Sequence, residues 1–274
     1  SNNVDGSDRV VYTIVIDHDA ISDTDAFDVT FFDQLPTDLN INFATDVTIT
    51  HSTAGDIKGL FELVAGNTLR TNGSTFDLSL GETVTIVVDA QIDPTVVGGQ
   101  VISNTASTSW TSIDGSDPNE RDGSGGESNY TESSTATTTV ESAALAKELV
   151  STSVNNSNNA NDEATIGELV TCRRTVGGPA GRVPGAQIID NLDLGLEFVS
   201  LDSVEVFSGA TPTALVTSSV DSFSNTASFN PAVTGNGTTT APTLEFDLGT
   251  IPNNNSNSTG ETMVVPYTAR VVTI

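Results

Sequence analysis

The chain carries an internal repeat, which limits the possible folds more than any other feature of the sequence. Four short blocks occur twice in the same order: residues 10–13 with 169–172, 33–39 with 190–196, 76–78 with 246–248, and 81–83 with 260–262. Four matches in register indicate two copies of one structural unit. The Asp-x-Leu-x-x-x-Leu block is expected to end a strand, make a polar turn and re-enter the core, and the Gly-Glu-Thr block to turn into a strand.

Short apolar runs rich in Val, Ile, Thr and Phe fill both copies. Gly, Asn, Asp and Ser interrupt them about every 8–12 residues, the spacing of an all-β sandwich. Residues 143–149 are too short and uncapped for a helix, so we expect a connector that runs into a strand there. The expected strands are residues 10–16, 27–32, 39–50, 83–90, 101–112, 133–141, 147–154, 169–176, 186–190, 196–207, 243–248 and 263–272.

We therefore predict an all-β protein of two tandem Ig-like β-sandwich domains, residues 1–142 and 143–274. The 274-residue length fits two domains at the usual size of roughly 100–200 residues each. A long acidic insertion over residues 110–130 interrupts the first domain. The single cysteine, Cys172, excludes an intrachain disulfide and a multi-cysteine metal site.

Each copy is expected to lack one strand that the other has. The second copy opens with residues 147–154, which have no counterpart before Ser1, and the first continues into residues 98–106, which have no counterpart before Ile274. Unpaired sheet edges must be covered, so we expect either that the native chain continues at both ends or that neighbouring molecules supply the missing strands by β-augmentation. A head-to-tail contact of this kind does not close and produces a filament. The predicted assembly residues are Lys147, Glu148, Leu149 and Val150 on the first strand and Val101, Ile102 and Asn104 on the last.

The charge of the chain excludes several classes of partner. Asp and Glu number 36 against 9 Lys and Arg, which gives a formal net charge of −27. Such a chain repels nucleic-acid backbones and anionic membrane surfaces. No apolar run reaches the length of a membrane span. We expect an extracellular protein whose partners are copies of itself, or further repeats of the same chain.

The repeated blocks and their neighbouring residues resemble the conserved-repeat domain of bacterial and archaeal cell-surface proteins, the DUF11 family. The matching segments are residues 146–147, 164–171, 184–185, 189–190 and 194–200 in the second copy, and 11–14, 33–36, 81–83 and 104–106 in the first. The sequence departs from the family at residues 171–173, where a Tyr is usual. The resemblance implies Ig-like sandwich repeats, displayed outside the cell in stalks, layers such as S-layers, or fibres. It implies no catalytic activity.

Two acidic segments have the oxygen-rich composition of calcium sites. For both, the alternative is a solvated acidic surface, and neither matches the EF-hand pattern. Apart from calcium, no cofactor is expected. The candidate ligands are Asp114, Asp117, Asn119 and Asp122 in the first segment, and Asp17, Asp19, Asp23 and Asp25 in the second.

A covalent cross-link between a lysine on a first strand and an asparagine on a last strand is a further hypothesis. Lys147 and Asn104 occupy such strands, but in different copies. The sequence favours ordinary roles for both: a solvated strand lysine, and an asparagine that satisfies buried backbone groups.

Motifs of enzymes are missing from the sequence. It has no nucleophile elbow, phosphate loop, dinucleotide fingerprint or His-Glu-x-x-His, and its two histidines have no matched partners. We therefore expect no catalytic residues and predict a structural subunit or segment of a surface filament or layer. The alternative is an adhesin that contacts a glycan or receptor through the loop over residues 110–130. A hydrolase is the third class, and it would require turnover that a single Asp or Glu substitution abolishes.

Overall fold

The computed structural model describes residues 4–124, 130–154, 163–178, 180–255 and 260–274. It divides into two compact units. Unit 1 consists mainly of Asp8–Asp93 and Gln100–Val140, and unit 2 of Pro94–Gly99 and Glu141–Ile274 together with Asp5–Ser7. The main division, after Val140, falls two residues before the predicted domain boundary. None of the helices in the described residues is long and apolar enough to cross a membrane.

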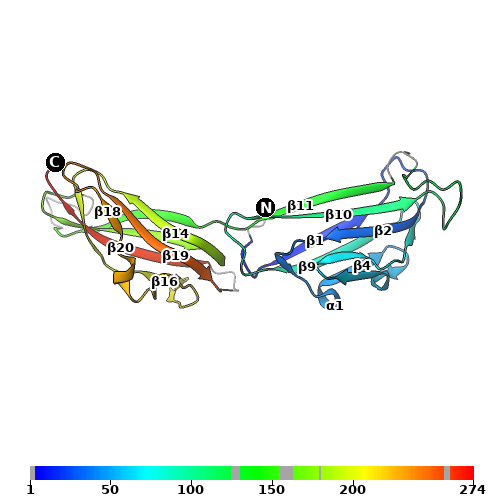
Figure 1. Ribbon diagram of the computed structural model, residues 1–274, viewed down its shortest axis with the longest axis horizontal. Coiled ribbons are helices and arrows are strands. Elements are labelled where there is room, and N and C mark those ends of the chain that lie inside the picture. Colours follow the sequence, from blue (N-terminus) through cyan, green and yellow to red (C-terminus); the bar gives the residue numbers. More distant parts are fainter. Residues whose placement is uncertain (1–3, 125–129, 155–162, 179, 256–259) are drawn as a thin grey trace. The chain divides into compact units, whose positions relative to one another are not determined.

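Unit 1 contains two antiparallel sheets (Figure 1). The first has the order β1-β9-β4-β5, with β3 also paired to β9, and the second has the order β11-β10-β2-β7-β6, with β8 also paired to β2. The strands of the first sheet are β1 (Arg9–Ile16), β9 (Val84–Ile92), β4 (Val47–His51), β5 (Gly55–Asp56) and β3 (Leu39–Asn40). Those of the second are β11 (Thr131–Thr139), β10 (Val101–Thr111), β2 (Ala26–Gln34), β7 (Thr68–Thr71), β6 (Phe61–Val64) and β8 (Phe76–Leu78).

Alternation along the strands builds the core of unit 1. In β9, every second side chain from Val84 to Ile92 is fully buried. In β2, Val29 and Phe31 face the same interior, and the Phe31 ring lies 6.0 Å from that of Phe61. Burial of β-branched and aromatic side chains on one face of each sheet is the main source of stability in such a sandwich.

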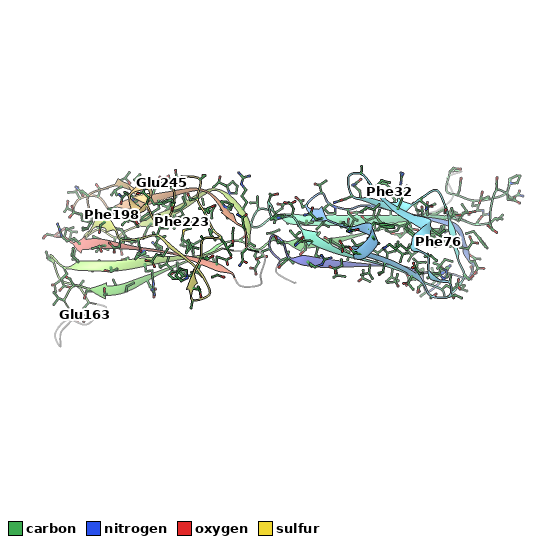
Figure 2. The ribbon with its side chains drawn as sticks, turned by 90° about the horizontal axis from the view of Figure 1, so that it is seen from below. Phe32, Phe76, Glu163, Phe198, Phe223 and Glu245 are labelled. Carbon is green, nitrogen blue, oxygen red and sulfur yellow. The ribbon has the colours of Figure 1, made fainter. Side chains whose placement is uncertain are left out.

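Unit 2 repeats this architecture (Figure 2). One sheet has the order β12-β13-β20-β16-β17, with β15 also paired to β20, and the other has the order β14-β19-β18. The strands of the first are β12 (Ala144–Thr152), β13 (Leu169–Gly178), β20 (Glu261–Val271), β16 (Glu205–Ser208), β17 (Thr211–Pro212) and β15 (Leu196–Leu201). Those of the second are β14 (Gly181–Asn191), β19 (Thr243–Asn253) and β18 (Ala232–Thr234).

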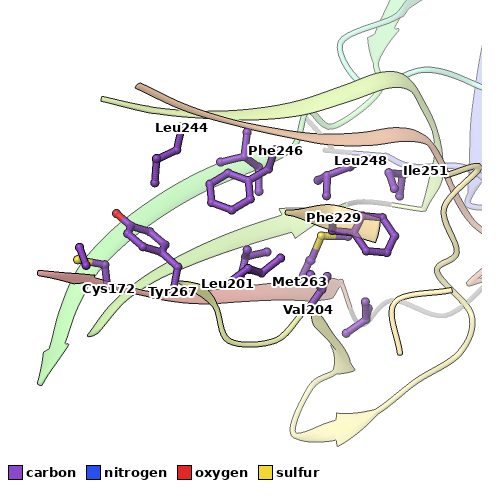
Figure 3. Packing of buried hydrophobic residues seen from close by; sticks show 14 of the residues in the cluster. Cys172, Leu201, Val204, Phe229, Leu244, Phe246, Leu248, Ile251, Met263 and Tyr267 are labelled. Atoms are coloured by element: carbon purple, nitrogen blue, oxygen red, sulfur yellow. The ribbon is translucent and has the colours of Figure 1, made fainter. Parts of the chain in front are cut away.

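The core of unit 2 lies between these two sheets (Figure 3). Leu244, Phe246 and Leu248 project from β19 toward Met263 and Tyr267 of β20. The Phe246 and Tyr267 rings are 6.1 Å apart, a common spacing for tilted aromatic pairs. The all-β prediction is therefore confirmed, with helix limited to α1 (Phe43–Asp46), η1 (Lys58–Leu60) and η2 (Thr226–Phe229) in the described residues.

The structure corrects several expected elements. The expected connector before residue 147 is shorter than predicted, because the strand that it runs into, β12, already begins at Ala144. The expected strand over residues 39–50 is interrupted by α1, since the Asn42 side chain accepts a hydrogen bond from the Ala44 amide and caps a helical turn. Strands β6 and β7 were not expected, because their runs are short and mixed in polarity.

The hydrogen-bond registers of β1 and β13 correct the alignment of the two copies by one residue along these equivalent strands. Tyr12 pairs with Val88, and Cys172 pairs with Tyr267. Because the Gly-Glu-Thr blocks make Val88 and Tyr267 equivalent, Tyr12 is equivalent to Cys172 rather than to Thr171. By the same register, Ile14 of β1 is equivalent to Arg174 of β13.

We expect Phe246→Ala to lower the free energy of unfolding by about 3–5 kcal/mol, since the ring is fully buried and its loss leaves a cavity. The matched control is Val233→Ala on the neighbouring strand β18, where the side chain is exposed and the change should stay within about 0.5 kcal/mol. Urea denaturation measures both, and equal losses would contradict the placement of the core.

Candidate functional site

Among the described residues, each unit leaves one strand edge without a partner strand where the equivalent edge of the other unit is paired. In unit 2, β12 pairs with β13, whereas the equivalent strand of unit 1, β1, is the edge of its sheet. In unit 1, β10 pairs with β2, whereas the equivalent strand of unit 2, β14, is the edge of its sheet. An isolated bridge between Val97 and Arg182 occupies only one end of β14. Each unit thus contains a template of the strand that the other lacks.

Unit 2 is hollowed along its open edge. A largely apolar cavity of about 400 Å³, which we call the unit 2 groove, lies between β12 and β14. Leu145, Val176, Ile188, Leu248 and Met263 are among the residues that line it. In unit 1, the equivalent space beside β2 is filled by β10, whose Ile102 is 1% exposed. The unit 2 groove therefore lies where β10 lies in unit 1, and its lining is largely apolar.

Strand β12 carries apolar side chains that face the unit 2 groove and stay exposed. Leu145, Lys147 and Leu149 alternate and so share one face of the strand. This face turns toward the groove, because Leu145 lines it, yet Leu145 and Leu149 are 55% and 44% exposed. Inward-facing leucines that remain exposed indicate a sandwich whose opposite wall is incomplete.

Lys147 reaches a buried carboxylate across the sandwich. Its Nζ lies 2.8 Å from Oδ1 of Asp190, a fully buried residue of β14. The Arg174 guanidinium donates to the same carboxylate, with Nε 2.8 Å from Oδ2, and the Tyr267 hydroxyl donates to Oδ2 at 2.5 Å. The ion pairs and hydrogen bonds of this one carboxylate thus connect β14 with β12, β13 and β20.

Two opposing effects set the pKa of Asp190. Burial raises it, but hydrogen bonds from Lys147, Tyr267 and Arg174 outweigh burial and hold the pKa below its usual range. Burial and the donated hydrogen bond to Asp190 raise the pKa of Tyr267 far above its usual range, so its hydroxyl keeps the proton. Asp190 is therefore an anion with a full set of donors.

Asp33 is the equivalent carboxylate of unit 1, and it is also fully buried. Its partner is the last strand rather than the first: Asn104 of β10 donates from Nδ2 to Asp33 Oδ2 at 2.9 Å. Unit 1 has Ile14 at the position of Arg174, so the guanidinium is replaced by an apolar side chain. Burial therefore raises the pKa of Asp33, and the hydrogen bond from Asn104 only partly offsets it.

Three polar atoms around Asp33 are left without partners. Asp33 Oδ1, Asn104 Oδ1 and the Tyr12 hydroxyl are buried and make no hydrogen bond to any described residue. Buried polar atoms are normally satisfied, so a group of three unpaired ones requires an explanation such as a bound water or ion, or a chemical role. A groove of about 570 Å³ lies along the open edge of unit 1, lined partly by Ile14, Ile16 and Ala106. We call this the unit 1 groove.

Two predicted assembly residues have roles that the sequence did not favour. The Lys147 side chain stays 35% exposed, as expected of a strand lysine at the surface, but its ammonium group is paired with buried Asp190. Asn104 does not satisfy backbone groups, because it bonds the Asp33 side chain. The remaining predicted assembly residues lie on the same two strands: Glu148, paired with Arg173; Leu149 and Val150, both exposed; Val101, exposed; and Ile102, buried.

Sequence reasoning missed the buried carboxylates. It assigned the repeated Asp-x-Leu-x-x-x-Leu block to a polar turn, although Asp33 and Asp190 are inside. Strand alternation contained the signal, because Asp33 lies two residues from Phe31 and Leu35, which are both buried. Arg174 and Tyr267 carried no such signal, since they meet Asp190 only through cross-strand packing.

The predicted calcium ligands come together only in part. Among the described residues, Asp114 lies with Asp28 and Asp77 in a group whose carboxylate oxygens are within 4.8 Å of one another. Asp117 and Asp122 instead accept hydrogen bonds from the amides of Asn119 and Ser124. The structure places part of the second segment, Asp17, Asp19 and Asp25, along the unit 1 groove, and Asp23 in the same connection. Calcium at these segments stays a prediction.

The loop over residues 110–130 is anchored at its base, and its residues 125–129 lie outside the described part. The Trp110 ring lies 6.1 Å from that of Tyr130, and the Trp110 amide donates to the Tyr130 carbonyl. The aromatic residues of this loop therefore pack on each other.

The two buried carboxylates predict opposite dependences of stability on pH. The pKa of Asp190 is lowered on folding, so its contribution is present above its unfolded pKa and is lost as pH falls below about 4. The pKa of Asp33 is raised, so its ionisation destabilises the fold as pH rises above about 4. Asp190→Asn should therefore cost about 3–5 kcal/mol near neutral pH and less in acid, whereas Asp33→Asn should stabilise near neutral pH and be neutral in acid.

Urea denaturation of both variants between acid and neutral pH tests this difference. Parallel stability profiles for the two variants would contradict the assigned ionisation states.

If calcium binds, the thermal midpoint should rise with added Ca²⁺ and fall again with a chelator, because a ligand bound only by the folded state stabilises it. Asp114→Asn should remove most of this shift, since Asp114 stands beside two further carboxylates. Asp193→Asn, at an exposed carboxylate outside both acidic segments, is the matched control. An unchanged midpoint in the parent protein would reject calcium binding.

Comparisons with known proteins establish no family. No protein-family model matches the chain, and no curated protein matches it in sequence. Among solved structures, the C-terminal domain of the Streptococcus pyogenes antigen I/II-family protein AspA is 11% identical, with 98% of this chain and 86% of that chain covered and a TM-score of 0.36. A C-terminal fragment of the major pilin GBS80 of Streptococcus agalactiae is 12% identical, with 85% and 71% covered and a TM-score of 0.28. Scores this low establish neither a common fold nor a common function.

Proposed function

We propose that this protein is a non-catalytic structural module of an extracellular filament or layer, in which repeats join head to tail by exchange of β-strands. Unit 1 receives a strand of the β12 type along β1, and unit 2 receives a strand of the β10 type along β14. The strands come from a neighbouring copy of the repeat.

The reciprocal open edges carry this proposal. Strands β13 and β1 are equivalent, and β12 covers only β13. Strands β2 and β14 are equivalent, and β10 covers only β2. The occupant of each open edge is thus defined by its counterpart in the other unit. Because the two edges need different strands, the contact joins unlike surfaces and extends rather than closes.

The energetics favour such an exchange. A docked strand would pair the free backbone groups of an edge and cover apolar surface in the adjoining groove. Each leucine that becomes fully buried contributes about 1.5–3 kcal/mol. Leu145 and Leu149 of β12 are two such side chains that an incoming last strand would cover. The net charge of −27 opposes non-specific association, so docking relies on shape and register.

A synthetic peptide of residues 142–154 tests the unit 1 edge. It should form a one-to-one complex with the full chain and raise its thermal midpoint, because it can pair with β1 and place its apolar face in the unit 1 groove. Native mass spectrometry and thermal unfolding measure the two effects.

The matched control peptide carries Leu145→Asp and Leu149→Asp, which remove the apolar face but keep the lysine. It should neither bind nor stabilise. Equal binding by both peptides, or by neither, would reject strand complementation. Electron microscopy of the concentrated protein then shows whether separate copies supply the strands, since added peptide should shorten any filaments.

A further inference from the structure

We infer that Asn104 is the acceptor of a covalent amide bond with the lysine of the strand that docks on unit 1, and that Asp33 is the catalytic acid–base group of this reaction. The inference rests on the proposed strand complementation and adds to it a chemical step that locks the strand in place.

Unit 2 shows where the lysine arrives. Lys147 pairs with Arg174 in the strand register and reaches Asp190, the equivalent of Asp33. A strand docked on β1 in the same register places its lysine opposite Ile14, the equivalent of Arg174. Its amine then meets the Asp33 carboxyl group, as Lys147 meets that of Asp190.

Unit 1 holds the acceptor at the same carboxyl group. Asn104 Nδ2 lies 2.9 Å from Asp33 Oδ2, while Asp33 Oδ1 and Asn104 Oδ1 have no partner among the described residues. Both residues are almost fully buried, with exposed fractions of 0% and 3%. A lysine amine bound at Asp33 therefore comes beside the Asn104 carboxamide, in an interior that excludes water.

The reaction needs a neutral amine and a protonated acid, and unit 1 favours both. Burial disfavours charge on a lysine and on a carboxyl group alike, and no arginine opposes it here because Ile14 replaces Arg174. Burial raises the pKa of Asp33, consistent with this need. In unit 2, Arg174 and Tyr267 keep Asp190 ionised, so Lys147 remains in an ion pair.

The chemistry balances without an oxidant or a co-reactant. The Asn104 carboxamide first turns so that its oxygen, in place of Nδ2, faces Asp33. Protonated Asp33 then donates a hydrogen bond to this carbonyl oxygen, and the lysine nitrogen attacks Cγ. A C–N bond to lysine forms, and the bond from Cγ to Nδ2 breaks. Asp33 transfers the proton lost by the amine to the leaving nitrogen, and ammonia departs. The product is a secondary amide with one ammonia fewer than the reactants.

The test mixes the full chain with the peptide of residues 142–154. We expect an adduct that survives boiling in SDS, with the summed mass of protein and peptide less one ammonia. Peptide fragmentation should place the bond between the peptide lysine and Asn104. Asp33→Asn should slow the reaction about 10²- to 10⁴-fold, the usual contribution of general acid–base catalysis.

Two controls separate the covalent step from docking. A peptide with Lys147→Arg leaves the protein unchanged and should bind and raise the thermal midpoint, but form no adduct. A full chain with a second copy of residues 142–154 joined by a flexible linker ahead of Ser1 raises the effective concentration of the strand. It should lose one ammonia on folding, whereas its Asn104→Ala form should not.

The outcomes are distinct. Stable binding with no loss of ammonia in either format overturns the cross-link and leaves strand complementation intact. Failure to bind in both formats overturns both proposals. An adduct at an asparagine other than Asn104 overturns the assignment of the acceptor.

Discussion

A carboxylate buried at the same position in each sandwich is the constraint around which both units are organised. An ion inside a protein is tolerated only with charged or hydrogen-bonding partners. Unit 2 supplies these partners from the strands around Asp190, including the first strand through Lys147. In the described part of unit 1 no strand covers the free edge of β1, and Asn104 of the last strand is the donor to Asp33. Asp190 thus has a full set of donors, whereas Asp33 Oδ1 has no partner among the described residues.

Small differences at equivalent positions give the two sites different chemistry. Arg174 in unit 2 corresponds to Ile14 in unit 1, and the tyrosine moves from one strand to its neighbour, from Tyr267 to Tyr12. The guanidinium helps to stabilise Asp190 as an anion and to lower its pKa. Asp33 has no such partner at the equivalent position, and burial raises its pKa, which favours the protonated form. A single repeat thus produces an ion-pairing site and a site suited to proton transfer.

The two free edges differ in how they are protected. Natural sheets normally protect edge strands with charges, prolines, bulges or covering segments. Strand β14 carries Pro184 and two shifts of register and is bridged at one end, whereas β1 is regular over eight residues and exposes Val11 and Val15. The strongly acidic composition opposes the indiscriminate aggregation that an edge such as β1 would otherwise invite.

The sequence alone determined the fold class, because strand alternation and turn residues are local patterns, and its repeated blocks indicated two copies of one unit. It also singled out Lys147 and Asn104, but assigned them ordinary roles, since they lie in different copies. Only the tertiary structure showed that Asp33 and Asp190 are interior and that each meets one of these two residues. These contacts join strands far apart in the chain, and the packing of two sheets, which no local pattern encodes, decides which side chains meet across them.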